Sequence, residues 1–274
     1  MITLKSIGFI GAGQMAQALA SGIAKSNADA SDSNQIELFI SDPNDATCDS
    51  FSKLIGANAK VYRVEDNQAV ASQSELVFLA VKPQYLDDAV DGVDFETSNP
   101  LIVSIVAGVR IYRLEQLTGI KRIIRVMPNT PCLIGQGASS ISPGETSTED
   151  TDLVKSFLSS VGLVVEVEES LIDSVTGISG SGPAYVYTFI EAMIDGGVLT
   201  GMPRSTAREL AIQTVIGAAL MVKESGEHPA VLRDRVTSPG GTTIEAMKSL
   251  EENSFRDTVI SAVQAATMRS QELG

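Results

Sequence analysis

A glycine-rich turn at Gly11-Ala12-Gly13-Gln14-Met15-Ala16 constrains the fold more than any other feature of this sequence. It lies between a β-rich run, Ser6–Ile10, and a segment with helical spacing. In a strand–turn–helix unit, Gly11 allows the tight turn, Gly13 allows close approach to a diphosphate, and Ala16 allows the helix to pack closely on the sheet. Backbone amides of the first helical turn, at Gln14 and Met15, would bind that diphosphate. We therefore expect a dinucleotide-binding α/β domain.

The first 167 residues repeat this alternation of β-rich runs and helical patterns, which is typical of parallel βαβ units. The run Leu76–Val81 is apolar throughout, as expected for a strand whose sheet is covered by helices on both faces. Two polar stretches, 27–35 and 142–150, are expected to be surface loops. The predicted strands are Ser6–Ile10, Ile36–Ser41, Leu76–Val81, Ile102–Ile105, Ile123–Val126, Ala138–Ser142 and Leu163–Val167.

After Glu168 the strand patterns disappear and helical periodicity continues to the C-terminus. The Arg204–Glu224 segment has a broad apolar face, which a small helical domain buries against a partner. We therefore expect a Rossmann-type dinucleotide-binding domain at 1–167 and an all-α domain at 168–274 that binds substrate and forms a homodimer or larger homo-oligomer. The predicted helices are Pro183–Thr200, with Ser181 nearby as a cap, then Arg204–Glu224, Thr243–Glu252 and Phe255–Leu273.

Composition narrows the possible partners and the compartment. A net charge of −14 argues against nucleic acid and anionic membranes, because a phosphate-binding surface needs a basic patch. The apolar runs are too short to span a membrane, and strand Ser6–Ile10 begins too early to leave room for a secretion signal. Cys48 and Cys132 lack metal-ligand spacing, and the acidic residues show no metal motif. We expect a cytoplasmic protein without a metal site.

The residues that follow the second predicted strand bear on the choice of dinucleotide. An acidic residue at this point bonds the adenosine ribose of NAD, whereas a basic one accepts the additional phosphate of NADP. Asp42 occupies the position, with no Lys or Arg adjacent to it, which leans toward NAD. Ser41 and Asn44 could still donate to a phosphate, and Asp42 could instead cap the next helix. NADP and NAD both remain open.

Several further motifs follow in order along the chain. Three of them lie at the ends of predicted strands, where the carboxyl ends of parallel strands face a bound dinucleotide. Together the motifs resemble the pyrroline-5-carboxylate reductases over essentially the whole sequence, and the segment around Ser238–Thr243 is the most specific of them. They are Ala80-Val81-Lys82-Pro83, Val106-Ala107-Gly108, Arg125–Pro131, Ser179–Tyr185 and Asp234–Ala246.

The resemblance implies an NAD(P)H-dependent reduction of a cyclic imine to L-proline, with NADPH accepted or preferred by most members. It implies a helical C-terminal domain that dimerises by interleaving helices. It also implies that Asn67 and the Ala80–Pro83 segment help to hold the cofactor. We add Ala107 and Gly108, which end a strand, and Asn129, which is placed for polar contact with nicotinamide or substrate.

The Ser238–Thr243 stretch is the expected substrate site. Gly240 and Gly241 let backbone N–H groups turn inward, and Thr242 has capping-box spacing to Glu245, so a helix N-terminus here would suit the substrate carboxylate. Ser238 and Thr242 belong to the same predicted site. From the family motif, Thr243 is the candidate catalytic hydroxyl. It would orient a protonated imine or relay a proton from water, because a Thr hydroxyl is a weak acid.

Two alternatives remain at this point. A dehydrogenase of the β-hydroxyacid or ketopantoate type would place a catalytic Lys on a helix of the second domain, yet helices 183–224 contain only Lys223, near their end. A non-catalytic NAD(P)-binding module would lack a second polar motif such as Ser238–Thr243. His228, the only histidine, is expected to have a loop or capping role rather than a catalytic one.

Overall fold

The computed structural model describes residues 4–26 and 35–273. The expected loop at 27–35 therefore lies, up to residue 34, outside the described residues. Two compact units divide the chain: Met1–Ser181 together with Ala265–Gly274, and Gly182–Gln264. This division differs from a boundary after Val167. Residues 168–181 and the last turns of the C-terminal helix belong to the first unit.

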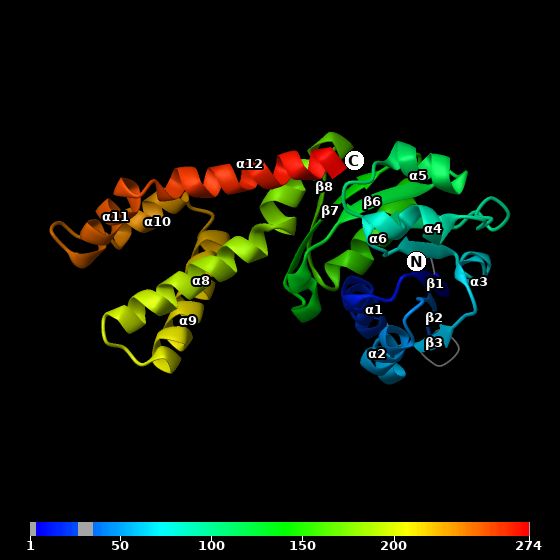
Figure 1. The fold of residues 1–274 in the computed structure, drawn as a ribbon, viewed down its shortest axis with the longest axis horizontal. Coiled ribbons are helices and arrows are strands. Elements are labelled where there is room, and N and C mark those ends of the chain that lie inside the picture. The colour runs from blue at the N-terminus through cyan, green and yellow to red at the C-terminus, as the bar shows by residue number, and fades with distance from the viewer. Residues whose placement is uncertain (1–3, 27–34, 274) are drawn as a thin grey trace. The chain divides into compact units, whose positions relative to one another are not determined.

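The first unit alternates strands and helices along the chain (Figure 1). Its strands are β1 (Ser6–Ile10), β2 (Glu37–Ser41), β3 (Lys60–Arg63), β4 (Leu76–Leu79), β5 (Leu101–Ser104), β6 (Ile123–Met127), β7 (Gly137–Pro143) and β8 (Gly162–Glu166). Its α-helices are α1 (Gln14–Ser26), α2 (Asp45–Ile55), α3 (Asn67–Gln73), α4 (Leu86–Val90), α5 (Ile111–Thr118), α6 (Thr148–Ser159) and α7 (Ile172–Val175). Single turns lie at η2 (Gly56–Asn58), η3 (Pro83–Tyr85), η4 (Thr130–Ile134) and η5 (Glu169–Leu171), and a π-helical turn at η6 (Thr176–Gly180).

The strands form one sheet in the order β3-β2-β1-β4-β5-β6-β7-β8. The order reverses between β1 and β4, and the carboxyl ends of strands beside such a point form the crevice where open α/β sheets bind ligands. The expected Rossmann-type domain is confirmed. The expectation of parallel pairing throughout is wrong at one place, because β7 runs antiparallel to β6.

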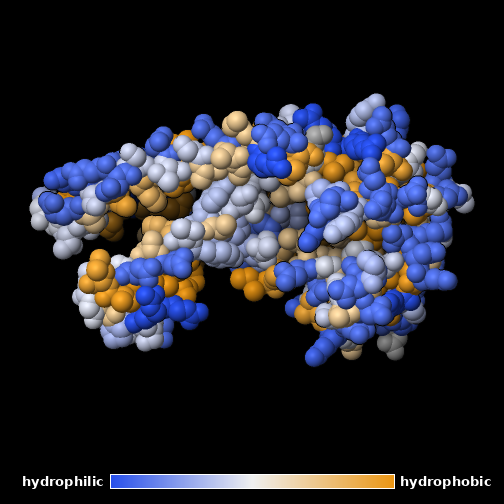
Figure 2. All heavy atoms as spheres, viewed as in Figure 1, coloured by the Kyte–Doolittle hydropathy of each residue, from blue (hydrophilic) through white to orange (hydrophobic). Residues whose placement is uncertain are grey.

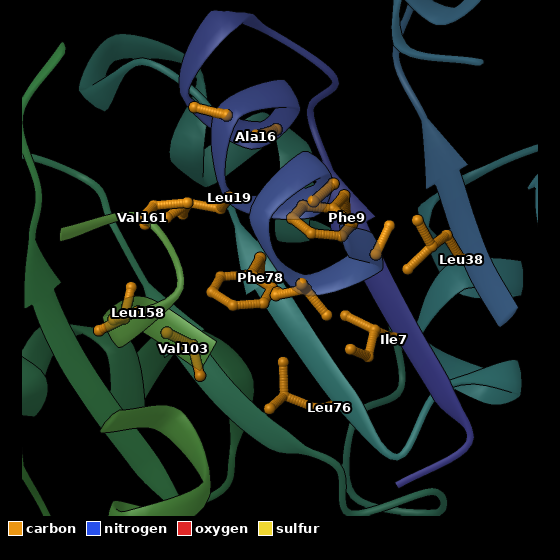
Figure 3. Close-up of a cluster of buried hydrophobic side chains, with 14 of the residues drawn as sticks. Ile7, Phe9, Ala16, Leu19, Leu38, Leu76, Phe78, Val103, Leu158 and Val161 are labelled. Carbon is orange, nitrogen blue, oxygen red and sulfur yellow. The ribbon is translucent and has the colours of Figure 1, made fainter. Parts of the chain in front are cut away.

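The sheet is covered on both faces, as the apolar β4 run predicts. Leu76 and Phe78 face a cluster that includes α1, α2 and α6, whereas Val77 and Leu79 face a cluster that includes α3, α4 and α5. This alternation is the two-residue period of a strand. Phe9 stacks on Phe78 with ring centroids 4.8 Å apart (Figure 3). The resulting core holds the carboxyl ends of β1 and β4 in place.

Strand β3 is absent from the sequence-based prediction. It has four residues, lies at the sheet edge, and is mostly exposed, so it lacks the apolar alternation that marks the other strands. The predicted 142–150 loop is also longer than the structure shows, because β7 extends to Pro143 and α6 begins at Thr148 with Ser147 as its cap.

The second unit is helical, as predicted. Its helices are α8 (Gly182–Leu199), α9 (Arg204–Ser225), α10 (Pro229–Arg235), α11 (Thr242–Glu252) and α12 (Phe255–Leu273), of which α12 ends in the first unit. Ser181 is not an isolated cap, because the π-helical turn leads directly into α8 and the Ser181 N–H donates to the Thr176 carbonyl at 2.8 Å.

Helix α9 buries only Ala207 and Ala211 within the chain. Large apolar side chains on it, including Leu210, Ile216 and Met221, are exposed, and Figure 2 shows hydrophobic atoms at the surface over α8 and α9. The broad apolar face of α9 is therefore present and uncovered in the single chain. None of the described helices is long and apolar enough to span a membrane.

Candidate dinucleotide and substrate sites

Gly11 sits where three strand ends converge. Its φ is +92°, and a Cβ at this position would lie 2.7 Å from the backbone oxygen of Ala80. Its N–H donates to the Ser41 carbonyl at 2.8 Å, and the Ala80 N–H donates to the Ile10 carbonyl at 2.9 Å. A side chain is therefore excluded both by the backbone conformation and by the close approach to β4. The turn between β1 and α1 needs glycine here for internal reasons.

Gly13 has a different environment. A Cβ built on it would meet no heavy atom within 4 Å, and its φ is outside the left-handed range. Directly after it, α1 begins at Gln14, and Ala16 is fully buried against the sheet. The N–H groups of the first helical turn, at Gln14 and Met15, have no acceptor within the helix and suit an anion. An open space next to an N-terminus of this kind fits the diphosphate of a dinucleotide.

Asp42 connects the end of β2 to the glycine-rich turn. One carboxylate oxygen accepts the Ala12 N–H at 2.9 Å, and the other accepts the Asn44 N–H at 2.9 Å. Asn44, not Asp42, is the N-cap of α2, with its side chain accepting the Ala46 N–H at 3.1 Å. The alternative that Asp42 caps this helix is therefore wrong. Asp42 instead holds the glycine-rich turn against β2.

The predicted segment Ala80–Pro83 follows β4, which ends at Leu79 rather than at Val81. Val81 lies beside Gly11, with its Cγ1 3.1 Å from the position of a glycine Cβ. Lys82 is exposed and precedes the η3 turn that begins at Pro83. Asn67 begins α3, and its Nδ2 donates to the Ala89 carbonyl at 2.8 Å. The side-chain amide of Asn67 thus joins α3 to α4 in the free protein.

Of the predicted residues after β5 and β6, Gly108 and Asn129 are packed within the first unit. Gly108 has φ +78° and faces Leu273 at the end of α12, whose Cβ lies 3.1 Å from the position of a Gly108 Cβ. Asn129 is buried, with Nδ2 donating to the Ser179 carbonyl at 3.0 Å and Oδ1 accepting the Ala138 N–H at 2.9 Å. Asn129 therefore connects the end of β6 to β7 and to the π-helical turn. Ala107, which follows β5, is partly exposed.

Two ion pairs near the strand ends are missing from the sequence-based prediction. Arg125 on β6 is 2% exposed and pairs with Glu169 at 3.2 Å, and Glu169 also accepts the Ile111 N–H at 2.7 Å. Burial lowers the pKa of Arg125, and Glu169 opposes that shift. Arg63 ends β3 and forms an ion pair with Asp45 at the start of α2. Each pair links segments far apart in sequence, so no local pattern reveals it.

The Ser238–Thr243 motif forms a turn and a helix start in the second unit. The Gly241 N–H donates to the Ser238 carbonyl at 3.1 Å, with Pro239 and Gly240 between them and Gly240 at φ +66°. Helix α11 begins at Thr242 with Gly241 at the N-cap, and no side chain caps it. The expectation that Thr242 caps this helix in a box with Glu245 is wrong, because Thr242 is already helical. The first-turn amides therefore remain without a side-chain cap.

Thr243 lies in this first turn and is half-buried. His228 is the N-cap of α10, with Nδ1 accepting the Ala230 N–H at 3.2 Å, which confirms its predicted capping role. Cys48 and Cys132 are both free and buried. In the described ranges 4–26 and 35–273, no group of three or more His, Cys, Asp or Glu residues has the arrangement of a metal site.

Comparison with known proteins gives two family matches along the chain. Residues 6–108 match the family described as NADP oxidoreductase, coenzyme F420-dependent, and residues 169–273 match the pyrroline-5-carboxylate reductase dimerisation family. The second match begins close to the predicted boundary after Val167, whereas the compact units of the structure divide after Ser181.

Relatives and solved structures match over nearly the full length. The pyrroline-5-carboxylate reductase of Synechocystis sp. is 44% identical, covering 98% of each chain, and that of Glycine max is 42% identical, covering 98% of this chain and 96% of the relative. The crystal structure of Plasmodium falciparum pyrroline carboxylate reductase with NADP bound is 36% identical with a TM-score of 0.84, covering 99% of this chain and 98% of the other. The turn at Gly11, the sheet order and the Ser238–Thr243 motif are thus explained together: this chain belongs to the pyrroline-5-carboxylate reductase family.

Proposed function

We propose that this protein reduces 1-pyrroline-5-carboxylate to L-proline with NADPH or NADH. The observation that carries the proposal is the full-length identity of 42–44% with reductases of this name, in a chain that keeps both the glycine-rich turn and the Ser238–Thr243 motif. This function excludes the two alternatives left open by the residues, a hydroxyacid dehydrogenase and a non-catalytic module.

The first unit holds the dinucleotide. The amides that follow Gly13 bind its diphosphate, and the open space at Gly13 lets the backbone approach closely. Asp42 keeps the turn in shape through the Ala12 N–H. Bound nicotinamide supplies the hydride, which is the chemistry of the cofactor rather than of a side chain. The further cofactor-binding residues in this proposal are Ser41, Asn67, Ala80, Val81, Lys82, Pro83, Ala107, Gly108 and Asn129.

The Ser238–Thr243 motif binds the substrate in this proposal. The uncapped amides at the start of α11 receive the substrate carboxylate, and Gly240 with Gly241 keeps their approach free of side chains. The Thr243 hydroxyl accepts a hydrogen bond from the N–H of the protonated imine and orients its C=N carbon. Because the iminium nitrogen already carries its proton, the hydride that a bound cofactor would supply would give the secondary amine without a further proton transfer. No strong side-chain acid is required.

The assembly is a homodimer or a larger homo-oligomer formed through residues 168–274. The exposed apolar side chains on α8, α9 and α12 support this part of the proposal, because a monomer rarely leaves so many uncovered. The two free, buried cysteines and the negative net charge support a cytoplasmic location without nucleic-acid or membrane partners.

A direct assay tests the reaction. Purified protein is mixed with 1-pyrroline-5-carboxylate and NADPH or NADH, and loss of reduced-nicotinamide absorbance is followed while L-proline is measured by chromatography. Ketopantoate serves as the comparison substrate. We expect oxidation with stoichiometric proline formation from the imine and none from ketopantoate. Folded protein that oxidises neither cofactor in the presence of the imine would contradict the proposed function.

A further inference from the structure

The adenosine end of the dinucleotide lies beside the end of β2 in a Rossmann-type domain, where the residue after the strand decides between a free ribose hydroxyl and a 2′-phosphate. In this chain that place is Ser41–Asn44. The inference that follows rests on the proposed function, because it assumes that NAD(P) binds at this turn.

Strand β3 brings a cation to this place. The register between β2 and β3 pairs Ile40 with Arg63, so Arg63 ends β3 beside the last residues of β2. The Arg63 guanidinium forms an ion pair with Asp45, which directly follows the helix cap Asn44. The side chain of Arg63 is 47% exposed, so it is open to a ligand from solvent. No residue adjacent to Asp42 in sequence offers such a charge.

Cys48, on α2, has both Arg63 and Asp42 near it. Burial raises the pKa of the Cys48 thiol, and the Arg63 guanidinium opposes that rise. The Cys48 Sγ in turn lies 3.8 Å from the Asp42 carbonyl oxygen. Arg63 pairs with Asp45 at the start of α2, and the Asp42 backbone contacts Cys48 of the same helix, so both lie beside the N-terminal half of α2.

The carboxylate of Asp42 is already engaged. Each of its oxygens accepts a backbone N–H, one from Ala12 in the turn and one from Asn44. These bonds give Asp42 a structural reason to be present whichever dinucleotide binds. An acidic residue at this position is therefore weak support for NAD. The remaining sequence argument for NAD is that no Lys or Arg is adjacent to Asp42 in the sequence.

We propose that Arg63 binds the 2′-phosphate of NADP(H) and thereby sets the preference of this protein for the phosphorylated dinucleotide. A guanidinium has five N–H donors in a planar fork, so one bond to Asp45 leaves donors for phosphate oxygens. Asp45 positions the guanidinium when no phosphate is bound. It also competes with the phosphate for the same charge, which gives the proposal a distinctive consequence: removing the Asp45 charge strengthens phosphate binding.

Calorimetric titration of the purified full-length protein with two adenosine nucleotides tests this assignment without turnover. Adenosine 2′,5′-bisphosphate carries the 2′-phosphate, and adenosine 5′-monophosphate lacks it, so the ratio of their affinities isolates that group. The variants are Arg63→Ala, Arg63→Lys and Asp45→Asn. Lys60→Ala is the matched control, because Lys60 is an exposed cation at the opposite end of the same strand.

We expect Arg63→Ala to lower the affinity ratio about tenfold or more, as for the loss of a charge-assisted hydrogen bond, and to leave the monophosphate affinity within about twofold. Arg63→Lys should retain part of the ratio, Asp45→Asn should raise it, and Lys60→Ala should leave it unchanged. Higher salt should reduce the ratio in the wild-type protein more than in Arg63→Ala.

The monophosphate affinity also shows whether each variant keeps a folded nucleotide site. An unchanged ratio in Arg63→Ala, or an equal loss of affinity for both nucleotides, would overturn the assignment of Arg63 while leaving the proposed function intact. Wild-type protein that binds neither nucleotide nor NADPH would instead overturn the dinucleotide site itself, and with it the proposed function.

Discussion

The same small substitution should have different effects at the two glycines of the turn. Gly11→Ala should lower the stability of the fold, whereas Gly13→Ala should weaken dinucleotide binding. Gly11→Ala places a methyl group 2.7 Å from the Ala80 backbone oxygen at φ +92°. The unfavourable backbone conformation costs about 1–2 kcal/mol, and forcing β1 and β4 apart adds about 1–3 kcal/mol. We therefore expect Gly11→Ala to lower the free energy of unfolding by about 2–5 kcal/mol.

Gly13→Ala meets no atom within 4 Å and needs no unusual backbone conformation. At a helix N-cap this change costs only about half a kcal/mol, so the protein should remain folded. Its methyl group, however, occupies the space through which the diphosphate approaches the amides of α1. We expect the dissociation constant for NADPH to rise about tenfold to a hundredfold, equivalent to about 1.4–2.8 kcal/mol.

Urea unfolding measures the first effect and a titration of reduced-nicotinamide fluorescence measures the second. The chain has no Trp, so protein fluorescence interferes little with the titration. A Gly13→Ala protein that is folded and binds NADPH like the wild type would refute the placement of the diphosphate at Gly13. A Gly11→Ala protein that unfolds at the wild-type urea concentration would refute the tight approach to Ala80.

Three other substitutions test the remaining inferences. Thr243→Ala should lower turnover about 10–100-fold with little change in NADPH affinity; unchanged turnover would remove Thr243 from the mechanism. Two hydrogen bonds from Arg122 hold the pKa of Asp150 below its usual value, so the pair stabilises the folded state at neutral pH and loses this effect as pH falls below the usual carboxyl range. Asp150→Asn should therefore lower the free energy of unfolding, measured with urea, by about 1 kcal/mol at neutral pH, a figure reduced because Arg122 is partly exposed. The loss should become smaller as the pH falls, and an equal loss at neutral and acid pH would contradict this. Leu210→Asp should shift the mass measured by light scattering toward the monomer, whereas Leu54→Asp, at a similarly exposed leucine outside residues 168–274, should not; equal masses for both would count against the apolar face of α9 as the interface.

The features that the sequence predicts well are those whose cause is local. A fully apolar run such as Leu76–Leu79 indicates a strand covered on both faces. Successive side chains of a strand point to opposite faces of the sheet, and here both faces are covered by helices. The glycine-rich turn is predictable because its backbone needs glycine within a few residues of β1. Helix α12 has the predicted bounds, since helical periodicity and a flanking turn suffice to define it.

Features that depend on pairing between distant parts of the chain could not be predicted from the sequence. Strand β3 exists because the edge of β2 is available to it, and its exposed residues carry little hydrophobic signal. The direction of β7 relative to β6 is antiparallel, and the composition of β7 does not indicate that direction. The helix start at Thr242 depends on how Gly240 and Gly241 turn the backbone, which the capping-box spacing did not reveal.

The cofactor site shows the same division. By itself the sequence determined that a glycine-rich turn of the dinucleotide-binding type follows the first strand, and it predicted that the Ser238–Thr243 motif binds the substrate. Only the tertiary structure decided what Asp42 does, since its carboxylate contacts Ala12 across 30 residues. It also decided which cation lies beside the end of β2, since Arg63 reaches Asp45 from the neighbouring strand. Hydrogen bonds and ion pairs join residues that are far apart in the sequence. Local sequence patterns indicate only the structure that neighbouring residues favour.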